Sequence, residues 1–256
     1  MVKLDVLADY SDADGNLIES PTTFSKNIDI VFKGKNNRMV VHPQARITKL
    51  RVKFDCDNGT LLIGPSKRKG FQMTIRVGQD STVKIGADLT TTALALVSAV
   101  EGTTVSFGDD VMLATGNQFR ADDGHPIFDV RTGKRTNPAR DIIIGSHVWF
   151  CTQAAALGGA IVMDGSVIGY RGIVTRKIPN NCIAVGSPAK VVKRDIAWER
   201  PHLSNVAPPY KPNVSSVEKS EAFWNLTTEE ARTSDEPVSE GFLAQILKAL
   251  FFRKIR

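Results

Sequence analysis

The sequence predicts an all-β solenoid: a left-handed parallel β-helix with one loop excursion and a C-terminal tail that ends in a short α-helix. An aliphatic or equivalent residue recurs every six positions in the second half of the chain, and the same pattern appears less cleanly upstream. Neither the period of a helix nor the two-residue alternation of a single strand fits this pattern. Each unit predicts one short strand and one turn, so that three units close a triangular coil and stacked coils share one core. The left-handed sense comes from the repeat class, because the crossover rule for parallel strands favours the right hand.

The six-residue period is clearest from Ile144 onward. The first positions of six successive units hold an aliphatic or equivalent residue: Ile144, Phe150, Ala156, Val162, Ile168 and Val174. Four residues after each of them stands a mostly small residue: Val148, Ala154, Ala160, Ser166, Gly172 and Ile178. We expect the first set to point into the coil and the second set to lie where the wall bends.

Upstream, the pattern is less regular but still present. Further units begin at Phe107, Leu113 and Phe119 in one phase, at Val77 and Ile85 with a phase slip between them, and more weakly at Ile63 and Val41. The solenoid domain is therefore expected to span residues 36–198.

Two segments flank this domain. Residues 1–35 lack the period and form a lead-in segment, with a strand expected at Ile28–Phe32. Residues 199–256 form a C-terminal extension, rich at first in Pro, Ser, Thr and Glu. Residues 242–256 carry apolar side chains at helical spacing, which predicts a short amphipathic helix. Its apolar face either docks on the protein or a partner, or lies on an anionic membrane surface.

The repeat breaks between Phe119 and Ile144. Residues 124–140 are rich in turn formers and basic residues, which predicts a loop that leaves the wall. Sites are often built on irregular loops carried by a rigid scaffold. Arg131 and Arg135 within the loop are either simply solvated, or they read an acidic acceptor or the phosphate of a cofactor.

Composition narrows the function classes. The formal net charge is +6, which suits a polyanionic partner such as a phosphorylated cofactor or an acidic glycan. No nucleic-acid-binding motif is present, so nucleic acid is not expected as a partner. The three cysteines are scattered, and the first residues do not form a secretory signal. We therefore expect a cytoplasmic protein, with a place at the inner face of the membrane left open.

Five stretches of the chain resemble the hexapeptide-repeat, left-handed β-helix acetyltransferases. They are Ile142–Trp149, Asp164–Gly169, Val174–Lys190, Leu113–Asn117 and Asp123–Ile127. The resemblance covers residues 28–198 and points to the branch that O-acetylates surface polysaccharides, including the capsular polysialic acid O-acetyltransferases. Within that branch, too, a HisProIle segment is followed by a basic loop and an IleGly…HisValTrp coil.

The resemblance implies a homotrimer that binds acetyl-CoA in the groove between neighbouring β-helices and transfers its acetyl group to a sugar hydroxyl. It implies His125 as the catalytic base and Trp149 as the residue that lines the acceptor and thioester end. The positions that match the family's CoA contacts are Thr152, Tyr170, Gly172, Thr175, Arg176, Lys190 and Lys193. Many relatives have Asn at the position of Gly116, and Asn117, one place later, is the candidate contact to the acceptor. Tyr170 replaces a usual Ala, and it would crowd the pantetheine arm or stack on it.

The chemistry of acyl transfer supports the same residues. A neutral imidazole near pH 7 is well matched to removing a hydroxyl proton. His125 lies at the edge of the repeat break beside Asp122 and Asp123, and one of these carboxylates would orient the ring. The alternative is a loop histidine in a turn before a proline. Trp149 is either a surface residue or a groove residue that packs a sugar or the thioester arm. His147 is expected to face outward, as an exposed or groove-wall residue.

Two rival functions remain open. A metal-dependent hydratase of the γ-carbonic-anhydrase kind shares the β-helix but needs three converging histidines, and the four histidines of this chain lack that spacing. The reaction that we expect requires no metal. A non-catalytic β-helix scaffold is the second rival, and it would have no use for a base or for CoA contacts.

Overall fold

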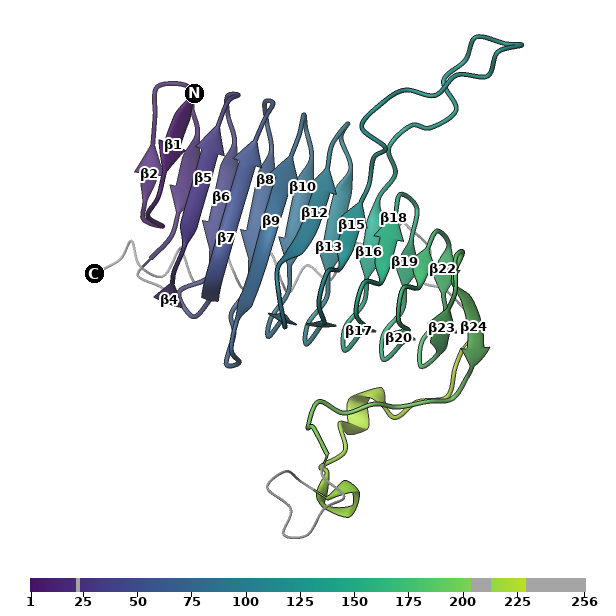
Figure 1. Cartoon of the computed structure of the whole chain (residues 1–256). Helices are drawn as coiled ribbons and strands as arrows, with labels where there is room; N and C mark the ends of the chain where they lie inside the picture. Colours follow the sequence, from purple (N-terminus) through teal and green to yellow (C-terminus); the bar gives the residue numbers. More distant parts are fainter. Residues whose placement is uncertain (22–23, 204–212, 229–256) are drawn as a thin grey trace.

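Three sheets form the walls of a β-solenoid in the computed structural model, and the strands of each sheet stack along its length (Figure 1). Residues 1–21, 24–203 and 213–228 are described. Within them, the helical elements are two short 3₁₀ helices, η1 (Val214–Ser216) and η2 (Glu221–Phe223), and none is an α-helix. The all-β solenoid is therefore confirmed. The α-helix expected at 242–256 lies outside the described residues.

From β9 onward, the chain passes through the three walls in the fixed order A, B, C. Wall A contains β1 (Val2–Leu4), β4 (Phe24–Ser25), β5 (Ile28–Phe32), β7 (Arg46–Phe54), β9 (Phe71–Val77), β12 (Ala95–Ala99), β15 (Gln118–Arg120), β18 (Ala155–Leu157) and β21 (Ile173–Val174). Wall B contains β2 (Tyr10–Ser11), β3 (Leu17–Glu19), β6 (Arg38–Val41), β8 (Thr60–Ile63), β10 (Thr82–Ile85), β13 (Thr104–Phe107), β16 (Ile142–Ile144), β19 (Ile161–Val162) and β22 (Lys177–Ile178). Wall C contains β11 (Thr90–Thr91), β14 (Met112–Leu113), β17 (Trp149–Phe150), β20 (Val167–Ile168), β23 (Ile183–Val185) and β24 (Lys190–Lys193).

Neighbouring strands within a wall are parallel except at the two ends of the stack. The pairs β1–β5 and β2–β3 are antiparallel at the N-terminal end, and β23–β24 is antiparallel at the C-terminal end. The strand expected at Ile28–Phe32 is β5, and it already pairs in parallel with β7. Parallel stacking therefore begins inside the segment that lacks the six-residue period.

The six-residue period fixes the core. Ile144 lies in register with Val162, and Phe150 lies in register with Ile168. All of the first-position residues from Ile144 to Val174 are buried, and so are the small residues at the bends up to Gly172. Burial of a large apolar side chain stabilises the fold by about 1.5–3 kcal/mol. Because no coil can bury its own inner face alone, this stabilisation is shared between neighbouring coils.

The coils become shorter along the chain. Thr82 pairs with Thr60 on one side and Thr104 on the other, so a coil takes 22 residues there. Trp149 pairs with Val167, and this later coil takes 18 residues. A 22-residue coil is not a multiple of six, which explains why the upstream units slip out of phase. The loop excursion lies at the step between the wide and the narrow coils.

The corner between walls B and C holds a column of residues with left-handed backbone. Asp88, Asp110, His147 and Asn181 have φ values of 57°, 58°, 53° and 52°. Asn, Asp and His are the side chains that adopt this conformation most often, whereas a β-branched residue would be strained there. The conformation turns these four polar side chains to one edge of the solenoid, where the C-terminal segment contacts Asp110, His147 and Asn181.

Candidate active site

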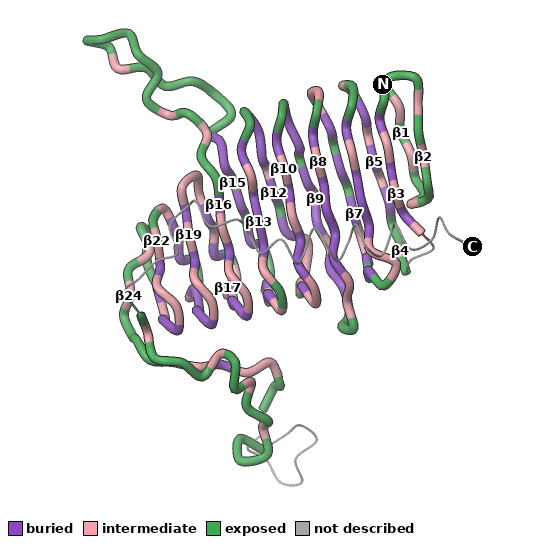
Figure 2. The backbone as a smooth tube through the Cα atoms, turned by 180° about the vertical axis from the view of Figure 1, so that it is seen from behind, coloured by how far each residue is buried: buried purple, intermediate pink, exposed green. Residues whose placement is uncertain are grey.

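The break in the repeat is an excursion that leaves the solenoid at the corner between walls A and B (Figures 1 and 2). It joins β15 to β16, and Figure 2 shows it as almost entirely exposed. An isolated bridge between Phe128 and Arg135 links its two limbs. At its base, the Asn137 side-chain Nδ2 donates to the backbone oxygen of His125 at 2.9 Å. The predicted loop is confirmed, and it is a defined two-limbed structure.

His125 stands exposed near the base of this excursion. The two carboxylates expected to orient its imidazole are engaged elsewhere. Asp122 is buried, where its Oδ2 accepts from the Ser98 hydroxyl at 2.6 Å, and Asp123 accepts from the Asn137 amide at 2.9 Å. The expectation that either carboxylate holds the ring is not met within one chain, because Asp122 lies against Ser98 and Arg76 on wall A and Asp123 is held by Asn137.

Of the two arginines proposed to read an acidic acceptor, Arg135 has a structural contact. Its Nη2 donates to Glu101 Oε1 at 2.9 Å and to the backbone oxygen of Asn137 at 3.0 Å. The hydrogen bond from Arg135, together with one from the Ala139 backbone, holds the pKa of Glu101 below its usual range. The pair ties the loop to the coil beneath it. Arg131 is exposed on the far part of the loop.

Asn117, the proposed acceptor contact, lies inside the solenoid. It is fully buried, and its Nδ2 donates to the backbone oxygens of Cys151 at 2.8 Å and Ala154 at 3.0 Å. The amide therefore joins two successive coils at the corner between walls C and A. Gly116 before it has a φ of 73°, which both Gly and Asn tolerate. The structure gives Asn117 this structural role, and we do not retain it as an acceptor contact.

Trp149 lies on the opposite side of the coil from His125. It is half-buried on wall C, next to Phe150, which points into the core. Because each coil passes through A, B and C in turn, the corner between A and B faces wall C across the coil. In Figure 1 the loop leaves at the top, whereas β17 lies near the lower edge. One chain alone therefore does not bring His125 and Trp149 together.

The residues expected to hold CoA fall at three places. Thr152, Tyr170 and Gly172 lie at the corner between walls C and A, after β17 and β20. Thr175 and Arg176 lie between β21 and β22, at the corner from which the His125 loop leaves. Lys190 and Lys193 are exposed on β24. Tyr170 is 60% exposed, and the Arg171 guanidinium lies 5.1 Å from the centre of its ring, so the side chain points outward.

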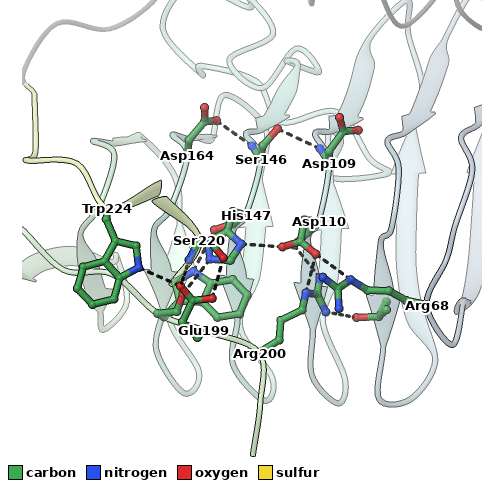
Figure 3. Close-up of polar contacts among 12 residues, drawn as sticks. Arg68, Asp109, Asp110, Ser146, His147, Asp164, Glu199, Arg200, Ser220 and Trp224 are labelled. Carbon is green, nitrogen blue, oxygen red and sulfur yellow. Dashed lines mark hydrogen bonds and ion pairs between the residues drawn. The ribbon is translucent and has the colours of Figure 1, made fainter. Parts of the chain in front are cut away.

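The C-terminal segment folds back along the corner between walls B and C, and residues 195–203 with 213–228 are called the strap below. The Ile196 backbone N donates to Asn181 O at 3.0 Å at the last coil. Further along, Arg200 Nε donates to Asp110 at 2.7 Å, three coils before the last one (Figure 3). The second limb returns and is tied to the first by Glu199, which accepts from Ser220 and from the Trp224 indole. The strap was not foreseen, because no periodic pattern marks it.

His147 is the residue that the strap covers. We expected an exposed or groove-wall histidine, but its exposed fraction is 2%. Its ring stacks on Trp198 on one face, with centroids 4.2 Å apart, and on Phe223 on the other, at 4.5 Å. The expectation was wrong because it considered the coil alone and not the segment packed on it.

Asp110 lies at the centre of the strap's polar contacts. Burial opposes ionisation of its carboxyl group, but the hydrogen bond with His147 and the charges of Arg200 and Arg68 outweigh it and hold the pKa below the usual range. The Arg68 and Arg200 guanidiniums both contact Asp110 Oδ1, at 3.0 and 2.7 Å. Their shared carboxylate links the turn after β8 to the strap.

Comparison with known proteins identifies the family. The polysialic acid O-acetyltransferase of Neisseria meningitidis is 30% identical over 182 residues, which are 71% of this chain and 84% of that protein. The chain belongs to the hexapeptide-repeat β-helix acetyltransferases. The polysialic acid O-acetyltransferase of Escherichia coli O1:K1 is 40% identical over 124 residues, which are 48% of this chain. The chain matches only 38% of the length of that relative. No protein-family model matches the chain.

Two solved structures show that the likeness of this chain extends to three dimensions. The polySia specific acetyltransferase NeuO superposes with a TM-score of 0.67 at 37% identity, covering 75% of this chain and 82% of that one. The polysialic acid O-acetyltransferase OatWY superposes with a TM-score of 0.61 at 23% identity, covering 76% and 92%. The second likeness shows a shared fold. Both support the β-helix as the scaffold on which the site is built.

Among the described residues of one chain, no group of three histidine, cysteine or acidic side chains is arranged to hold a metal ion. No helix in the part of the chain that the structure describes is long and apolar enough to cross a membrane.

Proposed function

We propose that the chain is an acetyl-CoA-dependent O-acetyltransferase that acetylates a hydroxyl of an acidic bacterial surface polysaccharide, with polysialic acid as the leading acceptor. The relationship to two polysialic acid O-acetyltransferases supports the substrate class. The net charge of +6 and the exposed basic loop suit a polyanionic acceptor. The single observation that carries the proposal is the exposed His125 at the base of the only long excursion from the walls in the described residues.

In this proposal His125 is the general base. Its neutral imidazole removes the proton of the acceptor hydroxyl while the oxygen attacks the thioester carbonyl of acetyl-CoA. The tetrahedral intermediate collapses with loss of the CoA thiolate, which takes the proton back from the imidazolium. A backbone N–H is the expected donor to the oxyanion. Neither a metal ion nor a covalent enzyme intermediate is needed to balance this reaction.

We further propose that the working enzyme is a homotrimer whose sites lie between neighbouring copies. His125, Thr175 and Arg176 share the corner between walls A and B, whereas Trp149, Thr152 and Tyr170 lie on or beside wall C. If the A–B corner of one copy faces wall C of the next, these two half-sites form one groove. Trp149 would then line the acceptor and thioester end, and Thr152, Tyr170, Gly172, Thr175, Arg176, Lys190 and Lys193 would hold CoA. The need for acetyl-CoA places the enzyme in the cytoplasm.

Substitution of the base tests the proposal. We expect His125→Ala to reduce acetyl transfer by about 10²–10⁴-fold, the usual contribution of a general base, while the affinity for CoA stays close to that of the wild type. Transfer is measured by thiol release from acetyl-CoA with a sialic acid polymer as acceptor, and CoA affinity by calorimetry. Val130→Ala, at a 97% exposed site of the same loop, is the matched control. Retained transfer in His125→Ala would refute the assignment of the base.

A further inference from the structure

The strap reaches the candidate site through one aromatic contact. The ring of Trp198 lies 5.7 Å from that of Trp149, tilted by 45°. Trp198 itself is only 8% exposed, and its indole Nε1 donates to the backbone oxygen of His147 at 3.0 Å. Trp149 is thus bordered on the outside of wall C by a side chain that does not belong to the β-helix.

His147 holds Trp198 by two kinds of contact. Its Nδ1 lies 2.7 Å from Asp110 Oδ2, and its Nε2 lies 2.9 Å from the backbone oxygen of Trp198. A backbone carbonyl oxygen can only accept, and Asp110 is a carboxylate because Arg68 and Arg200 both pair with it. Both ring nitrogens must therefore donate, which only the doubly protonated imidazolium can do.

The stacking geometry supports the same charge state. Trp198 and Phe223 lie against opposite faces of the His147 ring, with interplanar angles of 14° and 10°. The faces of indole and phenyl rings carry negative potential and attract a cation. The charged groups around the ring are Asp110 from the corner after β13, Glu199 and Arg200 from the strap, and Arg68 from the turn after β8.

We propose that His147 is a positioning residue, which as a buried imidazolium docks the strap and, through Trp198, fixes the indole of Trp149 in the candidate site. This inference rests on the proposed role of Trp149 in acetyl transfer. In that role the indole of Trp149 needs a fixed orientation, because it must present one face to the acceptor or to the acetyl arm. Contact with Trp198 restricts its rotamers from the side of wall C. The C-terminal extension is then a part of the active site and not an appendage to it.

A spectroscopic signature tests the arrangement without any need for activity. Two indoles at this separation and tilt couple excitonically, so the wild type is expected to show a tryptophan couplet in its circular dichroism. The couplet is expected to disappear in Trp149→Ala and Trp198→Ala, to weaken in His147→Gln, and to persist in the control Trp224→Ala, whose ring lies on the other limb and is 48% exposed. A couplet unchanged in both Trp198→Ala and His147→Gln would overturn the proposal.

Kinetics separate positioning from a merely structural role. We expect Trp198→Ala to lower kcat by about ten-fold or more with a change in KM for acetyl-CoA below about two-fold, since misplacement of a site group penalises the chemical step. Trp198→Phe keeps the stacked ring and should recover most of the loss. Kinetic constants unchanged in Trp198→Ala would also overturn the proposal. If the wild type transfers no acetyl group but shows the couplet, the proposed function fails and the positioning stands.

The ¹⁵N chemical shifts of labelled histidine test the charge of His147 separately. One unprotonated ring nitrogen in His147 would refute the imidazolium.

Discussion

The placement of His125 and Trp149 on opposite sides of the coil makes a quantitative prediction about mixed oligomers. Two inactive variants, His125→Ala and Trp149→Ala, carry complementary defects. If each site takes its histidine from one copy and its tryptophan from the next, a mixed oligomer contains interfaces at which both intact residues meet. Co-expression of the two variants with different affinity tags, followed by sequential purification on both tags, yields only mixed oligomers.

The size of the recovery follows from symmetry. A cyclic trimer has three equivalent head-to-tail interfaces. In a trimer with two copies of one variant and one of the other, a single interface combines the two intact residues, so mixed trimers should regain roughly one third of wild-type activity per trimer. The assay is thiol release from acetyl-CoA with a sialic acid polymer. Oligomers built from two differently tagged copies of His125→Ala provide the background. Mixed oligomers no more active than this background would refute a site shared between copies.

Three further predictions concern stability and the C-terminal extension. Acidification should release the strap. The depressed pKa of Asp110 gives a stabilisation that is fully present above the usual value of 3.8 and is lost as the pH falls through the lower pKa of the folded state. Tryptophan fluorescence should therefore change below about pH 4 in the wild type, and in Asp110→Asn it should already be altered at neutral pH. Phe119→Ala should lower the free energy of unfolding by about 3–5 kcal/mol, because Phe119 is fully buried between Phe107 and Phe150. A denaturant titration measures this loss, and the control Phe24→Ala, at a 41% exposed site, should show no comparable loss. If residues 242–256 bind a membrane, deletion of 241–256 should abolish co-sedimentation with anionic liposomes, and unchanged co-sedimentation would leave docking on protein as their role.

The six-residue period alone predicted the fold, because in a solenoid the spacing of the buried residues along the sequence follows from the length of each coil. The first-position residues from Ile144 to Val174 all stack in the core as expected. The upstream coils were harder to phase for a physical reason: the coil from Thr60 to Thr82 takes 22 residues, which is not a multiple of six, whereas the coil from Trp149 to Val167 takes 18. A period of six therefore fails there, although the strands still stack in register.

The candidate site was predicted only in part, since it depends on contacts that no local pattern encodes. The loop of His125 was visible as a break in the repeat. The burial of His147 was not, because a histidine at a bend looks solvent-facing until a distant segment packs on it. Asn117 was misplaced for the related reason that a polar residue at a corner can satisfy the next coil's carbonyls. A usable signal did exist in the strap, where Trp198 and Arg200 stand among polar residues directly after the last coil.

The step in coil length also bears on how such chains can change over time. His125 and Trp149 both lie at or after the step, within neighbouring turns of the solenoid, whereas the wide 22-residue turns all precede it. Within the walls, the strands of each wide turn pair only with strands of the turns directly above and below it. Duplication or loss of one such unit would therefore lengthen or shorten the rod by a single layer without altering the spacing of the catalytic groups. The number of wide turns can therefore change during evolution, whereas the turns that hold His125 and Trp149 are constrained by function.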